Sequence, residues 1–163
     1  MPMAAGPDEP SKVYLGRVVA SPRPYSPTES EIVEFARRWD PLPLHTDKEA
    51  AARTVFGGLT APGVMIDAIL IRLVHTAVKW PPGALIGMVG AEDVRYLQPV
   101  RPGDELSLRG EVVGLKRSQS NPERAVAKIR WELRRADRQL VHARTNIVLF
   151  HAGHCALDVP APE

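Results

Sequence analysis

Residues 39–63, W-D-P-L-P-L-H-T-D-K-E-A-A-A-R-T-V-F-G-G-L-T-A-P-G, contain the most specific pattern in the sequence. Pro41 and Pro43 each disfavour a helical conformation for the residue before them, so a helix arriving from the N-terminal side must end here. We expect a kinked, extended segment that turns the side chains of Asp40 and His45 toward a common point. Because a carboxylate and an imidazole can share one water molecule, these two residues are a candidate acid/base pair.

A long apolar helix is predicted to begin at the end of this stretch. Thr60 or Ala61 is the expected N-cap, and Pro62 fits the first turn, where its missing N–H costs nothing. The first N–H groups of a helix lack internal partners, and the macrodipole makes that end electropositive. Gly63 has no side chain to block an approach. Its N–H is therefore a candidate oxyanion-hole donor, which stabilises a carbonyl oxygen as that oxygen gains negative charge.

The stretch resembles the signature of the MaoC-like dehydratases, the (R)-specific enoyl-CoA hydratase branch of the hot-dog fold. The matching positions are Asp40, Pro43, His45, Asp47 and Gly63. The resemblance implies a hydro-lyase that adds water across trans-2-enoyl thioesters, or removes it from (R)-3-hydroxyacyl thioesters. It also implies that Asp40 and His45 are catalytic, that Gly63 supplies the oxyanion hole, and that two sheets join edge to edge in a homodimer. No cofactor is needed beyond the coenzyme A of the substrate.

The sequence departs from the family pattern at two places. Leu42 occupies the position of the signature's Asn, and residues 69–71, I-L-I, occupy the region of the long helix where the family often carries a small hydroxyl residue. Both changes remove polar groups from around the site. They leave the acid, the base and the glycine in place, so we expect them to affect rate and substrate preference.

Three helices are expected. The capping box of Thr28 and Glu31 opens a short helix that ends at Asp40. Asp47 is the expected N-cap of a second short helix, and we assign it that role in place of a catalytic one. The apolar positions of residues 62–78 predict the longest helix, which needs other elements to wrap it.

Strand-like patterns make up most of the remaining chain. Five segments are predicted as strands: 13–20, 84–98, 104–117, 125–136 and 139–150. In the last two, one face is expected to be buried, namely Ala125, Ala127, Ile129, Trp131 and Leu133, and then Val141, Ala143, Thr145, Ile147 and Leu149. About five antiparallel strands wrapped around one central helix give an α+β hot-dog domain over residues 12–151. Because such a sheet has two free edges, a homodimer is also expected from the pattern itself.

Composition limits the possible functions. The chain has 163 residues, 44% hydrophobic and 25% charged, which is enough for one domain with one core. A net charge of +2 with scattered arginines indicates no nucleic-acid partner. A single cysteine, Cys155, excludes an internal disulfide, and no apolar run is long enough to span a bilayer. We expect a cytoplasmic protein without a membrane contact, with a disordered leader at 1–11 and a loose tail at 152–163.

Two further groups of polar residues could have either a functional or an ordinary structural role. Asp67 and His75 on the long helix either point into a pocket or form a buried polar pair, but the helix dipole favours each where it stands, and we adopt that interpretation. His151, His154 and Cys155 are ligand-type residues at close spacing, but with no second cluster we predict no metal site.

The sequence leaves the substrate-binding residues and the function partly open. Arginine and lysine are natural partners of the phosphates of coenzyme A, and the candidates are Arg95, Arg101, Arg109, Lys116 and Arg117. The alternative to a hydratase is an acyl-CoA thioesterase, in which Asp40 activates water against the thioester carbonyl. A non-catalytic acyl-CoA-binding subunit, with Leu42 marking a degraded site, is the third possibility. The acyl chain length, the pathway and the choice of coenzyme A or acyl carrier protein are also open.

Overall fold

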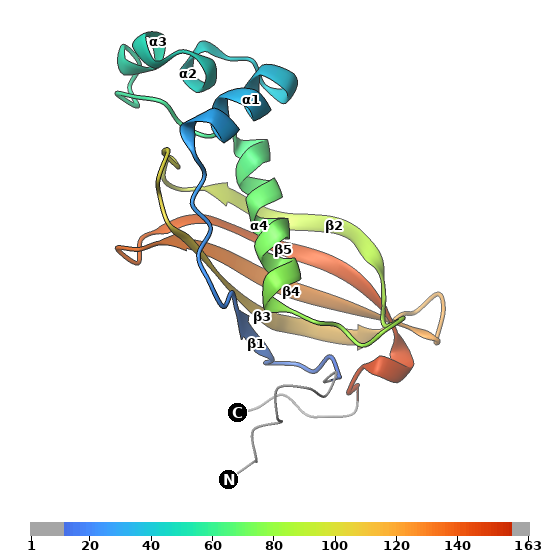
Figure 1. The fold of residues 1–163 in the computed structure, drawn as a ribbon. Helices are drawn as coiled ribbons and strands as arrows, with labels where there is room; N and C mark the ends of the chain where they lie inside the picture. The colour runs from blue at the N-terminus through green and yellow to red at the C-terminus, as the bar shows by residue number, and fades with distance from the viewer. Residues whose placement is uncertain (1–11, 158–163) are drawn as a thin grey trace.

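Figure 1 shows a curved five-stranded antiparallel sheet with one long helix lying across its face. The structure is a computed structural model, and it describes residues 12–157. The strands run in the order β1-β3-β4-β5-β2, with bounds β1 Val18–Ala20, β2 Leu85–Tyr96, β3 Leu106–Arg117, β4 Arg124–Arg135 and β5 Leu140–His151. The helices are α1 Glu29–Trp39, α2 Pro43–Thr46, α3 Lys48–Ala52, α4 Gly63–Ala77 and the 3-10 turn η1 Ala152–His154. The predicted architecture of five antiparallel strands and one long central helix is confirmed.

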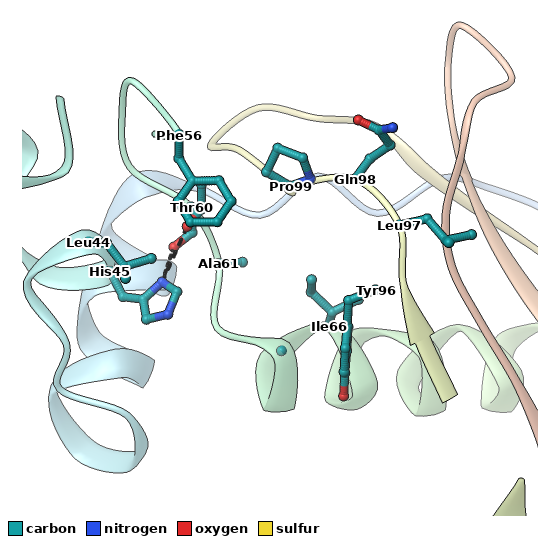
Figure 2. Close-up of a pocket in the computed structure, with 11 residues that line it drawn as sticks. Leu44, His45, Phe56, Thr60, Ala61, Ile66, Tyr96, Leu97, Gln98 and Pro99 are labelled. Atoms are coloured by element: carbon teal, nitrogen blue, oxygen red, sulfur yellow. Dashed lines mark hydrogen bonds between the residues drawn. The ribbon is translucent and has the colours of Figure 1, made fainter. Parts of the chain in front are cut away.

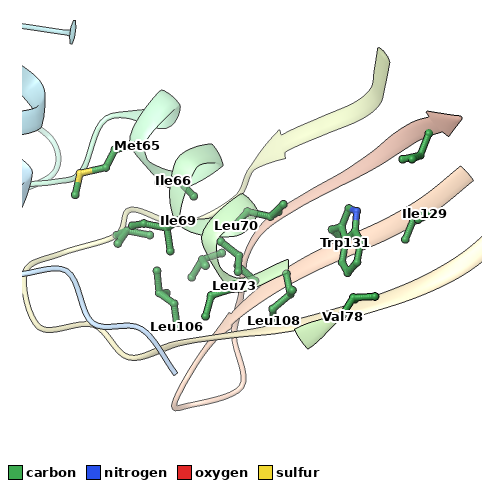
Figure 3. Close-up of a cluster of buried hydrophobic side chains, with 14 of the residues drawn as sticks. Met65, Ile66, Ile69, Leu70, Leu73, Val78, Leu106, Leu108, Ile129 and Trp131 are labelled. Carbon is green, nitrogen blue, oxygen red and sulfur yellow. The ribbon is translucent and has the colours of Figure 1, made fainter. Parts of the chain in front are cut away.

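The core lies between α4 and the sheet (Figure 3). The buried side of α4 consists of Met65, Ile66, Ile69, Leu70 and Leu73. Along β4 buried positions alternate as predicted and are Ala125, Ala127, Ile129, Trp131 and Leu133. Buried positions also alternate along the first half of β3. Gly110 of β3 lies against the indole of Trp131. A Cβ at this position would come within 2.0 Å of that ring. The close approach makes glycine necessary here.

The helix-facing side of β5 differs from the prediction. The register pairs Ala125 with Phe150 and Leu133 with His142, so the residues that share the helix-facing side with the buried face of β4 are His142, Arg144, Asn146, Val148 and Phe150. The expected face is buried only in part, since Ile147 and Leu149 are half-buried. The prediction was wrong about the side that faces the helix because three residues on that side are polar. His142 and Arg144 bond to Asp67 of α4, and Asn146 accepts from Arg144 on the same strand.

The two ends of the described chain also differ in structure from the prediction. Only Val18–Ala20 of the first predicted strand pairs continuously, because the chain turns at Gly16, whose φ is 81°. Val13 instead forms an isolated bridge with Cys155. Residues 152–157, predicted as the start of a loose tail, form η1 and this bridge. The predicted leader at 1–11 and residues 158–163 lie outside the described residues. Within residues 12–157, no helix combines the length and the apolar character that crossing a membrane requires.

Candidate active site

Asp40 is held at the C-terminal end of α1. The predicted capping box is present, since the Thr28 Oγ1 accepts a hydrogen bond from the Glu31 N–H at 3.2 Å and the Glu31 carboxylate accepts one from the Thr28 N–H at 2.7 Å. At the other end the Asp40 N–H donates to the carbonyl of Ala36 at 2.8 Å. Asp40 then leaves the helical conformation with φ −154° and ψ 73°. The end of α1 therefore presents the carboxylate to the following segment.

His45 belongs to a one-turn helix that the sequence did not predict. Leu42 is extended as expected, with φ −74° and ψ 142°. Pro43 then occupies the first position of α2, where proline is well tolerated, so the segment is not extended throughout. The prediction was wrong because a proline restricts the residue before it and leaves its own position free to begin a helix. The turn directs the His45 side chain inward, where it is only 10% exposed.

The hydrogen bonds of His45 fix the position of its proton. Its Nδ1 lies 2.6 Å from the carbonyl oxygen of Thr60, which only accepts, so Nδ1 carries the proton (Figure 2). In the neutral ring Nε2 is therefore an acceptor. This atom lies 3.7 Å from Asp40 Oδ2, too far for a direct hydrogen bond. The two acceptors face each other across a gap that one water molecule can bridge, as the candidate pair requires.

Gly63 is the first residue of α4, and Pro62 is the N-cap. The predicted N-caps belong instead to the segment leading into the helix, where the Thr60 carbonyl binds His45 and the Ala61 N–H donates to the carbonyl of Val100 at 2.8 Å. At the first position of a helix the N–H has no acceptor within the helix. A Cβ on Gly63 would lie 3.2 Å from the ring of Tyr96, so a side chain at this position would press on that ring.

One cavity connects these groups. It has a volume of ≈400 Å³ and borders His45, Thr60, Gly63 and Tyr96 (Figure 2). The rest of its lining is mostly apolar and consists of Leu44, Phe56, Ala61, Ile66, Leu97, Gln98 and Pro99. Asp40 is not one of the lining residues, but its carboxylate lies 3.7 Å from His45 Nε2. The structure thus places His45 and Gly63 on one cavity and Asp40 beside His45.

A group of polar residues beside the cavity was missed by sequence reasoning. The Asp67 carboxylate accepts hydrogen bonds from Tyr96 OH at 2.6 Å and from Arg144 Nη1 at 2.6 Å, and it lies within hydrogen-bond distance of His142 Nε2 at 3.1 Å. The interpretation of Asp67 as a carboxylate placed only by the helix dipole is therefore wrong. The only sequence signal was an acid on an apolar helix, because its partners are 29, 75 and 77 positions away.

These contacts change the acidity of both Asp67 and Tyr96. Burial on its own raises the pKa of Asp67, but the hydrogen bonds from His142, Tyr96 and Arg144, together with the positive charge of Arg144, outweigh it. They hold the pKa of Asp67 well below its ordinary value. Burial and the hydrogen bond to Asp67 raise the pKa of Tyr96 to about 12. Asp67 is thus ionised and Tyr96 a neutral donor across the physiological range.

Of the five candidate phosphate partners, Arg101 is adjacent to the cavity. Its Nη2 donates to the carbonyl of Phe56, a lining residue. Arg109 instead pairs with Glu111 at 2.9 Å, and Arg117 donates to the carbonyl of Pro122 at 2.8 Å. The remaining two, Arg95 and Lys116, do not line the cavity.

Two of the three ligand-type residues near the C-terminal end, Cys155 and His151, contact each other. Cys155 is buried, and its thiol donates to the carbonyl of His151 at a distance of 3.8 Å. Among residues 12–157, no three side chains of His, Cys, Asp or Glu are grouped so that they can hold a metal ion.

Comparisons with known proteins show the family of this chain. The family model of the MaoC-like domain matches residues 11–131. The chain belongs to the MaoC-like dehydratase family. A UPF0336 protein of Streptomyces avermitilis is 30% identical to it over 140 residues, which cover 83% of this chain and 91% of that protein.

Solved structures of the MaoC-like family share the fold. The MaoC-like dehydratase from Rhodospirillum rubrum superposes with a TM-score of 0.77 and 33% identity, covering 84% of this chain and 92% of that one. An (R)-hydratase from A. caviae involved in PHA biosynthesis has a TM-score of 0.65 and 21% identity, covering 82% and 94%, and shows the fold alone. The predicted hot-dog fold is thereby confirmed. Membership of this family supports a hydratase or dehydratase role.

Proposed function

We propose that this MaoC-like protein is an (R)-specific enoyl-CoA hydratase, which adds water across a trans-2-enoyl thioester or catalyses the reverse dehydration. The observation that supports the proposal is that His45 and Gly63 line one cavity and that the Asp40 carboxylate lies 3.7 Å from His45 Nε2. This reaction needs two acceptors that can contact one water molecule. It also needs an electropositive donor that can contact a carbonyl oxygen.

In the proposed reaction the thioester oxygen lies against the Gly63 N–H and the water lies between Asp40 and His45. The water oxygen bonds to C3 while one acceptor of the pair takes a water proton. The electrons of the C2–C3 double bond move toward the thioester, and the resulting enolate oxygen is stabilised by the N–H at the start of α4. The pair then returns a proton to C2 on the same face, which gives syn addition. Because the two groups face one water, they act as a coupled unit.

The coenzyme A end of the substrate would meet Arg101. This side chain is fixed to the Phe56 carbonyl at the rim of the cavity. Its guanidinium has further N–H groups, and a fork of this kind matches phosphate oxygens. An acyl carrier protein presents a phosphate through its prosthetic arm as well, so the same contact serves either donor.

We also propose a homodimer joined along β2. This strand is one edge of the sheet and pairs only with β5 among the described strands. Long free edges tend to find partners, and exposed apolar side chains strengthen that tendency. The large hydrophobic side chains exposed on β2 are Leu85, Ile86, Met88, Val89 and Tyr96.

The test of the proposed function follows two products at once. Wild-type protein is mixed with crotonyl-CoA, and the enoyl-thioester absorbance is recorded beside a free-thiol assay. We expect loss of the enoyl band without thiol release, and an (R)-3-hydroxy product on chiral chromatography. Thiol release from crotonyl-CoA or butyryl-CoA would instead identify a thioesterase. Tight binding with neither reaction would identify a non-catalytic acyl-CoA-binding subunit.

A further inference from the structure

A second cavity lies further along α4, between this helix and strands β2, β4 and β5. Its volume is ≈330 Å³, and it is lined from α4 by Ile71 and Val74 and from the sheet by Met88 and Val148. Ile66 of the first cavity precedes these positions on α4, so the two cavities follow one another along the helix. The second lining is mainly apolar, which suits an alkyl chain.

Five polar side chains separate the two cavities, and we call them the polar partition: Asp67, Tyr96, His142, Arg144 and Asn146. Asp67 comes from α4, Tyr96 comes from β2, and the other three come from the helix-facing side of β5. Tyr96 lines the first cavity and Asn146 lines the second. The partition therefore has one cavity on each side.

The polar partition is connected by hydrogen bonds, and its three members on β5 are buried, whereas Asp67 is half-buried and Tyr96 is 49% exposed. Asp67 binds Tyr96, His142 and Arg144, and the Arg144 Nε donates to Asn146 Oδ1 at 2.7 Å. The ring of Tyr96 stacks on that of His142 with a centroid distance of 4.8 Å. His142 and Arg144 are 0% and 8% exposed. Moving Asp67 aside would leave the buried Arg144 without its charge partner, which is unfavourable in the protein interior.

The position of Tyr96 brings this barrier close to the reacting atoms. Its ring lies 3.2 Å from where a Cβ on Gly63 would be. A thioester bound at the Gly63 N–H thus has the Tyr96 ring beside the first carbons of its acyl chain. Beyond the ring stand the ionised Asp67 and Arg144. Methylene groups pressed against these charges would strip them of their polar environment without replacing it.

We propose, resting on the proposed hydratase function, that the polar partition ends the acyl site and limits this enzyme to short-chain enoyl thioesters. The second cavity is then an apolar space that the substrate tail does not reach in the wild-type protein. Chain-length selectivity in this molecule comes from a hydrogen-bonded polar barrier, and the space behind it is already present.

The first test is the chain-length profile of the wild-type enzyme. The kcat/KM is measured for crotonyl-CoA, trans-2-hexenoyl-CoA, trans-2-octenoyl-CoA and trans-2-decenoyl-CoA. We expect a fall of at least about tenfold between crotonyl-CoA and octenoyl-CoA, since one misplaced methylene group already changes specificity by about this factor. Octenoyl-CoA turned over as well as crotonyl-CoA would overturn the proposal.

The second test removes the ion pair of the polar partition, so that neither of its two charges is left without a partner. The double variant Asp67→Ala/Arg144→Met deletes both members of the ion pair, and His142 keeps its Nδ1 hydrogen bond to the Arg95 carbonyl at 2.9 Å. We expect the octenoyl-to-crotonyl ratio of kcat/KM to rise about tenfold. Adding Val74→Phe, which fills the second cavity, should cancel that rise. In the wild-type background Val74→Phe should leave crotonyl-CoA turnover unchanged. A folded double variant with an unaltered ratio contradicts the proposal.

A binding measurement separates this inference from the proposed reaction. Isothermal titration of wild-type protein with butyryl-CoA and octanoyl-CoA needs no turnover. If crotonyl-CoA is not hydrated, the hydratase function fails, yet tighter binding of butyryl-CoA would still support the barrier. Equal or tighter binding of octanoyl-CoA would overturn it, whatever the reaction proves to be.

Discussion

A single hydrogen bond decides how His45 can act. Its Nδ1 donates to the Thr60 carbonyl at 2.6 Å, so its Nε2 faces Asp40 as an acceptor when the ring is neutral. The carbonyl comes from the segment leading into α4, the helix that also supplies the Gly63 N–H. Proton position and oxyanion donor are therefore set by neighbouring parts of the chain, and a shift of this segment would disturb both.

Leu42 replaces the Asn of the family signature, and its place in the structure indicates what the replacement costs. It is the N-cap of α2, its side chain makes no capping hydrogen bond, and it is 49% exposed. An asparagine at an N-cap accepts a hydrogen bond from an N–H of the first turn. The departure therefore bears first on the stability of the turn that carries His45.

We expect Leu42→Asn to stabilise the protein by about 1 kcal/mol, the usual contribution of an N-cap side chain. For a chain of this size that corresponds to a rise in melting temperature of roughly 2–4 °C, measured by circular dichroism. Leu42→Ala is the control, because it shortens the side chain without adding an acceptor. If the asparagine variant melts no higher than the alanine variant, the capping role assigned to this position is wrong.

Among the elements, β2 combines a free edge with the most exposed apolar surface. It spans twelve residues, whereas β1 at the other edge spans three. Charged substitution at an edge is an effective way to prevent edge-to-edge pairing. The two edges can therefore be compared directly, with Val89 on β2 at 61% exposure and Val18 on β1 at 51%.

We expect the wild-type protein to have the mass of a dimer in light scattering after gel filtration. Val89→Lys should convert it to a monomer, because two lysines would meet at the joined edges. Val18→Lys should remain a dimer, since it places the same charge on the opposite edge. A monomeric wild type, or a dimer lost only through Val18→Lys, would contradict the proposed interface.

Local patterns predicted the elements well and their mutual contacts poorly. The capping box of Thr28 and Glu31 and the apolar run of α4 are encoded over a few residues, so their helices were found. The turn at Pro43 was missed because proline statistics allow both outcomes at that residue. The face of β5 was misassigned because His142 and its polar neighbours are compatible with the core only through Asp67, a contact spanning 75 positions.

At the scale of the whole molecule, three separate elements meet at the site. Asp40 ends α1, His45 lies on α2, and Gly63 begins α4. Their spacing in the sequence predicted that they would meet, because all three lie in one continuous stretch. The polar partition was not predictable in this way, since its members come from α4, β2 and β5. Pattern reasoning thus grouped the proposed catalytic residues but did not find the polar partition.

The most direct test of the central claim, that Asp40 and His45 act on one water, is the turnover of crotonyl-CoA by Asp40→Asn. The variant keeps the shape of the side chain and removes its charge. We expect kcat to fall by about 10²–10⁴, the range attributed to general acid–base catalysis, with the melting temperature preserved. Asp137→Asn is the matched control in the turn between β4 and β5, where it should leave kcat unchanged. An Asp40→Asn enzyme as active as this control would contradict the account.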